Sequence, residues 1–208
     1  LLVLEQLPKP VNFSGVQQTI SMNGSFTLKR ILGTVPVEDD GSAHFEAPAL
    51  RSLYFVALDG QGRTVKRMQS FCSVMPGETL SCVGCHEKRV ESPRSAAVLQ
   101  ATARPASKIE SIAGVPDVID YPRHVQPIWD KHCTECHNPD KPDGRVVLTG
   151  DYNDWFTQSY YALFSSSQVS DSEGYEEDGN RRARGFGSVA SPLMGKIDGS
   201  HYGVRLSD

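Results

Sequence analysis

The sequence predicts a multi-domain α+β protein, in which a small β-sandwich-like module over residues 1–107 precedes an all-α domain over residues 108–208. Three observations support this organisation. Short runs of β-forming residues separated by turn signals fill the first half. A stretch rich in Pro, Ser and Ala, residues 91–116, indicates a linker. In the second half, apolar residues recur at the spacing of a helix face.

The first module is expected to contain four or five short strands. Leu53 to Leu58 is an apolar run typical of a buried strand, and Asp59-Gly60-Gln61-Gly62 is a turn signal that predicts a hairpin with the run after it. Residues 1–22 carry few periodic signals. The expected strands lie at 25–37, 44–45, 53–58 and 64–70, and a short helix is expected at 96–101.

Two helices are expected in the second domain. The first begins near Tyr121-Pro122, and a single face of it runs into Cys133; this face is formed by Val125, Ile128, Trp129 and His132. The second is expected over 152–165, with Asp151 as its N-cap and a face of aromatic residues that includes Trp155. A long polar loop with an acidic run, 171–178, and a basic run, 181–184, follows.

The pentad C-x-x-C-H occurs twice, as Cys82-Val83-Gly84-Cys85-His86 and as Cys133-Thr134-Glu135-Cys136-His137. This is the attachment pattern of a c-type haem, because the two thiols bond the two vinyl groups and the adjacent His ligates the iron. A zinc site built from both Cys pairs is the alternative. However, the gap between the pairs is much longer than the gap of about 15–20 residues that separates the pairs of a zinc ribbon. The sequence therefore predicts two covalently bound haem c groups.

Each haem needs axial ligands, and His86 and His137 are the expected proximal ones. For the second haem, His201 is the favoured distal ligand because it lies downstream of the pentad, which gives bis-His ligation. Met194 and His124 are the alternatives, and His132 is expected to be constrained by packing or by a propionate contact.

For the first haem the sequence offers no obvious distal ligand. His44 is one candidate, and an open iron would be a place for chemistry. Cys72, the cysteine outside the pentads, is expected to be a small buried residue, with a ligand near His86 as the alternative.

Composition bounds the partners and the compartment. The chain has 208 residues, a net charge of −4 and 38% hydrophobic residues, which favours neither nucleic acid nor an anionic membrane as a partner. No apolar run approaches the roughly 18 residues of a membrane span. Because covalent haem is attached outside the energy-transducing membrane, a periplasmic or equivalent exported compartment is expected for this mature form or fragment. A redox partner protein or other haem domains are the expected partners. The sequence leaves open whether the chain forms a homo-oligomer.

Several motifs resemble a known family. The middle domain of the hydrazine synthase α subunit and its planctomycete relatives is similar to LGTVPV at 32–37, DGSAHFEAPA at 40–49, PGE at 76–78 and CVGCHE at 82–87. That family's C-terminal cytochrome c domain is similar to HVQPIW at 124–129, the second pentad, SPLM at 191–194 and GSHYG at 199–203.

The resemblance implies a β-rich domain that bears an unusual haem, followed by a helical bis-His cytochrome domain that relays electrons. In hydrazine synthases a Tyr four residues after the first pentad His ligates the haem, while that His binds zinc. Here the position is Val90. The departure favours ordinary ligation by His86.

The leading hypothesis is a dihaem c-type cytochrome that transfers electrons, with the second haem as the relay. The second hypothesis is a redox enzyme that acts on a small molecule, such as a nitrogen compound, at an open first haem. A haem-based sensor module is the third. Ligation discriminates among them, because six-coordinate irons favour electron transfer and a five-coordinate iron that binds CO favours catalysis or sensing.

Overall fold

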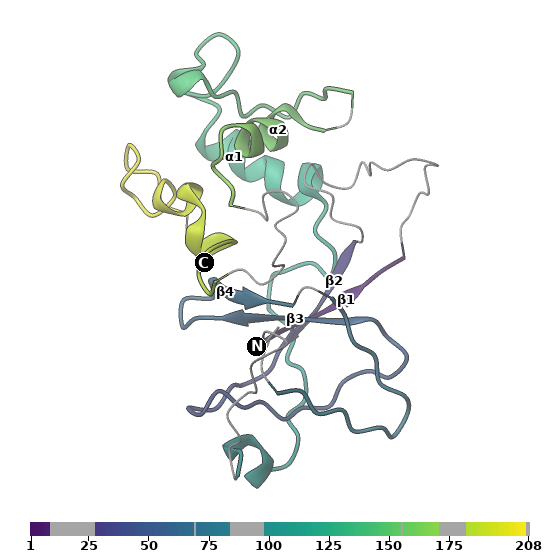
Figure 1. The fold of residues 1–208 in the computed structure, drawn as a ribbon. Helices are drawn as coiled ribbons and strands as arrows, with labels where there is room; N and C mark the ends of the chain where they lie inside the picture. The colour runs from purple at the N-terminus through teal and green to yellow at the C-terminus, as the bar shows by residue number, and fades with distance from the viewer. Residues whose placement is uncertain (9–27, 69, 84–97, 155, 171–181, 207–208) are drawn as a thin grey trace. The chain divides into compact units, whose positions relative to one another are not determined.

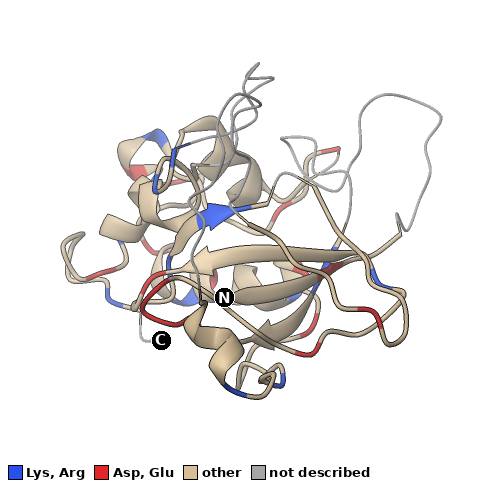
Figure 2. Cartoon of the chain, turned by 60° about the horizontal axis from the view of Figure 1, so that its bottom comes forward, with Lys and Arg blue, Asp and Glu red and all other residues tan. Residues whose placement is uncertain are grey.

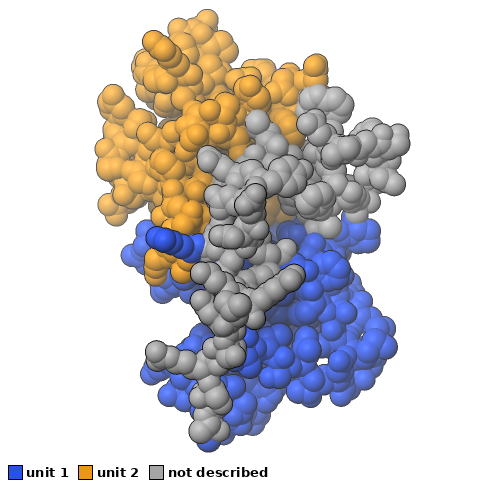
Figure 3. Space-filling view, in the orientation of Figure 1, with its two compact units in different colours: residues 1–8, 27–118, 178–182 blue, residues 9–26, 119–177, 183–208 orange. Residues whose placement is uncertain are grey.

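The computed structural model of the chain describes residues 1–8, 28–68, 70–83, 98–154, 156–170 and 182–206. The chain divides into two compact units, coloured blue and orange in Figure 3. Within the described ranges, the first unit holds residues up to Val118 together with Arg182, and the second holds the rest from Ile119 onward.

The first unit is built on one antiparallel sheet of four strands, in the order β2-β1-β3-β4 (Figure 1). The β3–β4 hairpin and the strand at β2 confirm the sequence expectation. The expected second layer of a sandwich is not found among the described residues, where Phe45 makes only an isolated bridge to Ser107. The strands are β1 (Leu2–Gln6), β2 (Lys29–Thr34), β3 (Leu53–Leu58) and β4 (Thr64–Arg67).

The strand β1, which the sequence did not predict, lies in the middle of this sheet between β2 and β3. Its residues Val3 and Leu4 are both buried, although they point to opposite faces of the sheet. A strand covered on both faces has no alternation of apolar and polar residues, so the period-2 signal is missing. Leu4 packs with Tyr54 and Val56 of β3 in the apolar cluster of the unit.

A buried carboxylate of β1 ties three segments of the first unit together. The Glu5 side chain accepts hydrogen bonds from Arg51, at 2.7 Å, and from Arg30 of β2, at 3.0 Å. The bond from Arg51, together with Arg30, holds the pKa of Glu5 below its usual range, although burial opposes this. The charge of Glu5 therefore stabilises the folded state.

Replacing Glu5 by Gln is expected to lower the stability of the first unit by about 1–2 kcal/mol at neutral pH, since both arginines are partly exposed and their pairs are screened. A depressed pKa contributes stability above the unfolded value and loses it as pH falls through the folded value. The wild type should thus lose stability in acid more steeply than Glu5→Gln. Thermal melts from pH 7 to pH 3 measure this, with the exposed Glu46→Gln as the control; parallel curves for wild type and Glu5→Gln would contradict it.

Residues 98–118 complete the first unit by packing along the sheet. Thr34 and Glu110 exchange backbone hydrogen bonds of 2.8 and 2.9 Å, and the Ile31 N–H donates to the carbonyl of Asp117 at 2.6 Å. The segment begins with a 3₁₀ turn, Gln100–Ala103, where a helix over 96–101 was expected; residues 96 and 97 lie outside the described ranges. Residues 108–118, which the sequence suggested placing in the second domain, thus belong structurally with the sheet.

The described part of the second unit consists of two short α-helices, 3₁₀ and π turns, and loops. Trp129, Leu148, Ala162 and Leu163 form its buried core. The helices are α1 (Gln126–His132), preceded by a π turn at Tyr121–Val125, and α2 (Gln158–Ser165), with 3₁₀ turns at Asp143–Arg145, Ser188–Ala190 and Pro192–Gly195.

The helix α2 begins later than the sequence predicts, and the assignment of Asp151 as its N-cap was wrong. Thr157 is the N-cap, and its side chain accepts from the Tyr160 N–H. Before it, the Asn153 side chain accepts from the Phe156 N–H at 2.8 Å, which forms a local turn. This side-chain bond offers the backbone an alternative to the helix. Trp155 lies outside the described residues.

Charged residues are interspersed along both units, and no single sign dominates the view in Figure 2. Within the described ranges, none of the helices has the length and apolar character needed to cross a membrane.

Candidate functional site

The second pentad begins where α1 ends. Cys133 is the C-cap of the helix, and its N–H donates to the Trp129 carbonyl at 2.8 Å. Its side chain packs against the core of the unit, and this burial raises the pKa of the thiol. The expected face of α1 is borne out at Val125 and Trp129, whereas Ile128 is exposed. One thiol of the pentad is therefore fixed by the packing of the helix.

The other thiol of the pentad lies beside a cation. Lys141 Nζ is 3.5 Å from the sulfur of Cys136, and this hydrogen bond raises the pKa of Lys141. The Cys136 N–H donates to the Cys133 carbonyl at 3.1 Å, so the two cysteines are joined by a single turn of backbone. Both thiols are free and half-buried.

The histidine of the pentad is held at three points. Its N–H donates to the Cys133 carbonyl, and its carbonyl accepts from the Leu148 N–H at 2.8 Å. Its ring nitrogen Nδ1 lies 3.1 Å from the Val146 carbonyl oxygen. Because a carbonyl only accepts, Nδ1 is the donor in this contact, and in the neutral form of His137 the lone pair is on Nε2. This arrangement is typical of a histidine that ligates a metal through Nε2.

The ring of His201 lies next to that of His137. The ring centres are 6.0 Å apart, and the ring planes differ by 20°. Two imidazoles that bind one metal from opposite sides have centres about 6–6.5 Å apart, given metal–nitrogen bonds of about 2.0–2.1 Å. The separation of the ring centres thus lies at the lower end of this range, and the two rings are nearly parallel.

His201 reaches this position on a closed loop. The loop is closed at its base by a hydrogen bond of 3.0 Å from the Leu206 N–H to the Ile197 carbonyl and by a bridge between Asp198 and Arg205. Ile197 packs against the same core as Cys133 and Val146. One apolar core thus positions the pentad, the carbonyl that binds the His137 ring, and the loop of His201.

A buried network of polar groups connects α1 to α2 and to the segment around Leu148. Gln126 donates through Nε2 to the Leu148 carbonyl at 2.9 Å and to Asp130 at 2.8 Å, and it accepts from the Ser159 hydroxyl. The Trp129 indole N–H donates to the Tyr121 hydroxyl at 2.7 Å, and that hydroxyl lies 3.1 Å from Ser159 Oγ. Burial raises the pKa of Tyr121. The network joins α1 and α2 to the loop segment that carries Val146 and Leu148.

Replacing Gln126 by Leu is expected to destabilise the second unit by about 2–3 kcal/mol, because the Leu148 carbonyl loses the bond from Gln126 and the buried Ser159 hydroxyl loses one of its partners. Unfolding by urea, followed through tryptophan fluorescence, measures the loss. Lys131→Ala, an exposed change on the same helix, is the matched control and should change stability by less than about 0.5 kcal/mol. Equal stability of Gln126→Leu and Lys131→Ala would contradict this account of the network.

The other histidine and methionine candidates of this unit lie elsewhere. Nδ1 of His124 accepts from the Asp120 N–H at 2.9 Å, so in its neutral form the proton is on Nε2, and the ring acts as part of a helix cap. Met194 lines an apolar cavity of about 330 Å³ together with Phe164, Val169 and Leu193. His132 is half-buried beside Cys133. Of the described histidines of this unit, the structure brings His201 into a ring contact with His137.

In the first pentad only Cys82 and Val83 are described, and both are exposed; Cys85, His86 and Val90 lie outside the described residues. Cys72 pairs with Leu53 in an isolated bridge. Burial raises the pKa of its thiol, and the Cys82 thiol adds to this effect. The expectation for Cys72 is met only in part, because its side chain is half-buried.

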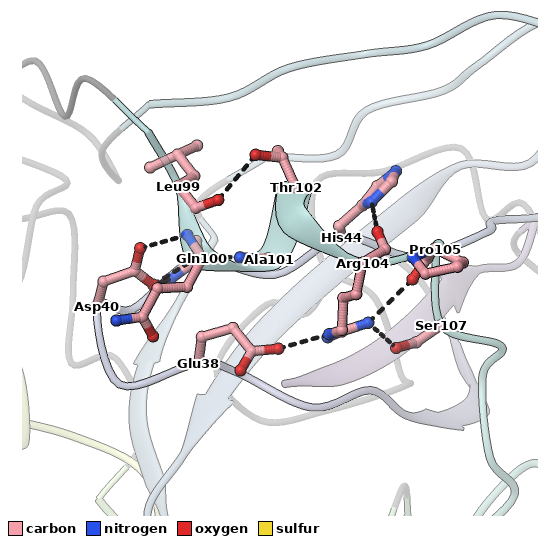
Figure 4. A network of polar contacts seen from close by, with 11 residues as sticks. Glu38, Asp40, His44, Leu99, Gln100, Ala101, Thr102, Arg104, Pro105 and Ser107 are labelled. Carbon is pink, nitrogen blue, oxygen red and sulfur yellow. Dashed lines mark hydrogen bonds and ion pairs between the residues drawn. The ribbon is translucent and has the colours of Figure 1, made fainter.

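His44 is held in a polar network that Figure 4 shows. Its Nδ1 lies 3.3 Å from the carbonyl oxygen of Arg104, so Nδ1 is the donor, and in the neutral form of His44 the lone pair is on Nε2. The Arg104 guanidinium pairs with Glu38 at 2.6 Å, and the Asp40 carboxylate accepts from the Gln100 N–H at 2.8 Å. These bonds anchor 99–107, the segment that follows the first pentad, to the 38–46 loop.

Among the described residues, no group of three or more His, Cys, Asp or Glu side chains is arranged to hold a metal ion by itself. The donor set of the second pentad instead fits a haem, which brings its own four nitrogen ligands and needs only two more. Sequence reasoning missed the carbonyl of Val146 and the side chain of Gln126, because a backbone acceptor and a buried amide carry no sequence signal.

Comparisons with known proteins agree with the motifs. Residues 5–87 match the family model described as hydrazine synthase alpha subunit middle domain. A solved structure titled Kuenenia stuttgartiensis hydrazine synthase matches with a TM-score of 0.57 and 16% identity. No curated protein matches the chain.

The structural match covers 86% of this chain, whereas the chain spans only 30% of the length of the solved one. At this identity the match shows a shared fold. The family match covers β2, β3, β4, the last two residues of β1 and the first pentad as far as Glu87. Both findings support the relationship to hydrazine synthase alpha subunits that the motifs indicated.

Proposed function

We propose that this chain is part of a c-type cytochrome in which the second unit carries a covalently attached haem and transfers electrons. The observation that carries the proposal is the pairing of the His137 and His201 rings at 6.0 Å. Bound there, a haem c would supply reversible one-electron oxidation and reduction at its iron.

The chain's own residues divide the task of holding this group. Cys133 and Cys136 would each add across one vinyl group, with sulfur bonding one carbon and hydrogen the other, so that nothing is released. His137 and His201 would be the axial ligands. The Val146 carbonyl, 3.1 Å from Nδ1, would fix the tautomer and the ring orientation of His137.

The first pentad is proposed to hold a second haem through Cys82, Cys85 and His86. Its support is the C-x-x-C-H spacing and the family match that ends at Glu87. Val90 stands where hydrazine synthases have a ligating Tyr, so His86 is proposed as the proximal ligand. The proposal also implies an exported compartment, where thioether bonds are made, and a redox protein or another haem domain as the partner.

Covalent attachment tests the proposal. The full chain, made in a host with a c-type maturation system and denatured, should keep two haems in its intact mass. Cys133→Ala/Cys136→Ala should lose one haem, Cys82→Ala/Cys85→Ala should lose the other, and Cys72→Ala, the control, should keep both. A wild-type chain that loses all its haem on denaturation would overturn the proposal.

A second candidate function is a redox reaction on a small nitrogen compound at the first pentad. The observation that favours it is the family match over residues 5–87, which includes that pentad. The two candidates differ in the coordination of the first iron. A Soret band that shifts under CO in Cys133→Ala/Cys136→Ala would favour the reaction, and an unshifted band would favour electron transfer.

A further inference from the structure

Tyr202 occupies a turn position that its residue type does not favour. Its φ is +49° and that of Gly203 is +77°, and the Val204 N–H donates to the His201 carbonyl at 2.9 Å. Two positive φ angles under such a bond are typical of a type I′ turn. Asn, Asp and Gly are the residues preferred at the first of these two positions, and an aromatic residue there is strained.

Burial of the side chain does not offset this strain, because Tyr202 is 95% exposed. Its ring instead meets the ring of His201, with centres 4.9 Å apart and planes at 83°. This is the edge-to-face geometry in which aromatic rings attract each other. A strained residue that gains little from burial and contacts a candidate iron ligand points to a role at that ligand.

We propose that Tyr202 is a positioning residue, whose ring limits rotation of the His201 imidazole and keeps it paired with His137. This inference rests on the proposed function. Gly203, the second central residue of the turn, and Gly199, two residues before His201, have no side chain to support the imidazole. Within the described residues, the ring contacts of His201 are those with His137 and Tyr202.

The experiment compares Tyr202→Phe, Tyr202→Asn and Tyr202→Gly in the haem-loaded full chain. Cyanide, titrated into the oxidised protein and followed at the Soret band, competes with His201 for the iron. Phe keeps the ring and should bind cyanide within twofold of wild type. Asn and Gly remove the ring and should bind cyanide about three- to tenfold more tightly, which corresponds to one aromatic contact.

Thermal unfolding of the same variants separates the ring from the turn. Asn and Gly suit a positive φ, so both variants should melt at or above the wild-type temperature while they lose the axial ligand more readily. If Tyr202 served folding alone, the Asn and Gly variants would instead melt at lower temperatures than wild type, and the loss of the axial ligand would accompany this loss of stability.

Two results would overturn the proposal. Wild-type cyanide affinity in Tyr202→Asn and Tyr202→Gly would remove the role of the ring, and so would a Tyr202→Phe protein that binds cyanide as tightly as Tyr202→Asn. Either leaves the proposed function intact if the wild type is low-spin. A wild-type second haem that is high-spin and five-coordinate would remove both the proposed function and this inference.

Discussion

Replacing His201 by Ala is expected to convert the second haem from low-spin to high-spin. The centres of the His137 and His201 rings are 6.0 Å apart, and the Ile197–Leu206 hydrogen bond closes the loop of His201. Among the described histidines, His201 is the one whose ring contacts the His137 ring. Removing the imidazole leaves the iron with His137 alone. The electron paramagnetic resonance spectrum of the oxidised protein measures the change, in the Cys82→Ala/Cys85→Ala background that keeps only the second pentad.

His124→Ala is the matched control for this prediction. Because Nδ1 of His124 accepts from the Asp120 N–H, the ring caps the π turn and is not expected to bind iron. His124→Ala should therefore stay low-spin. A low-spin spectrum in His201→Ala would contradict the assignment of His201, and a high-spin spectrum in His124→Ala would transfer the assignment to that residue.

Replacing Gly33 by Ala is expected to cost the first unit at least about 3 kcal/mol of stability. The φ of Gly33 is +136°, and an added Cβ would lie 2.1 Å from the Glu110 carbonyl oxygen, which is a backbone atom that cannot move aside alone. That carbonyl also accepts from the Thr34 N–H, so the clash would break the pairing of β2 with residues 107–118. Amide hydrogen exchange of residues 29–34 measures the loss locally.

Two glycines of the same unit provide controls. Gly60 has no positive φ and open space around its Cα, so Gly60→Ala should be close to neutral. Gly41 has a φ of +82° but no neighbour within 4 Å, so Gly41→Ala should show backbone strain alone, about 1–2 kcal/mol. If Gly33→Ala exchanged no faster than Gly41→Ala, the close approach to Glu110 would not be what fixes this glycine.

Local sequence signals predicted the elements that local interactions determine. The β3–β4 hairpin follows from an apolar run and the turn that Asp59 and Gly62 form, and Asp59 indeed accepts backbone bonds within that turn. The helix that runs into Cys133 follows from its apolar spacing. In both cases the residues that specify the element lie within a few positions of each other.

The elements that were missed depend on partners distant in sequence. Leu2 to Gln6 becomes a strand because β2 and β3 pair with it on both sides, and nothing within those residues indicates this. The start of α2 was misplaced for a local reason, since the Asn153 side chain closes a turn that competes with the helix.

At the candidate site, sequence spacing predicted the thiols and His137 and favoured His201 from its place downstream. It could not predict that Val146 supplies the carbonyl for Nδ1, since every residue carries a carbonyl and only the fold selects one. The role proposed for Tyr202 could not be predicted from the sequence either. It rests on a backbone angle and a ring contact, and neither can be derived from the residue type.

The most direct test of the central claim is the spectrum of the oxidised Cys82→Ala/Cys85→Ala protein, recorded by electron paramagnetic resonance and followed by optical spectra after reduction under CO. Paired imidazoles of His137 and His201 predict a low-spin ferric signal and a Soret band that CO does not shift. A high-spin signal with a CO-shifted Soret band would contradict the claim, because it would show an iron that lacks one of the two ligands.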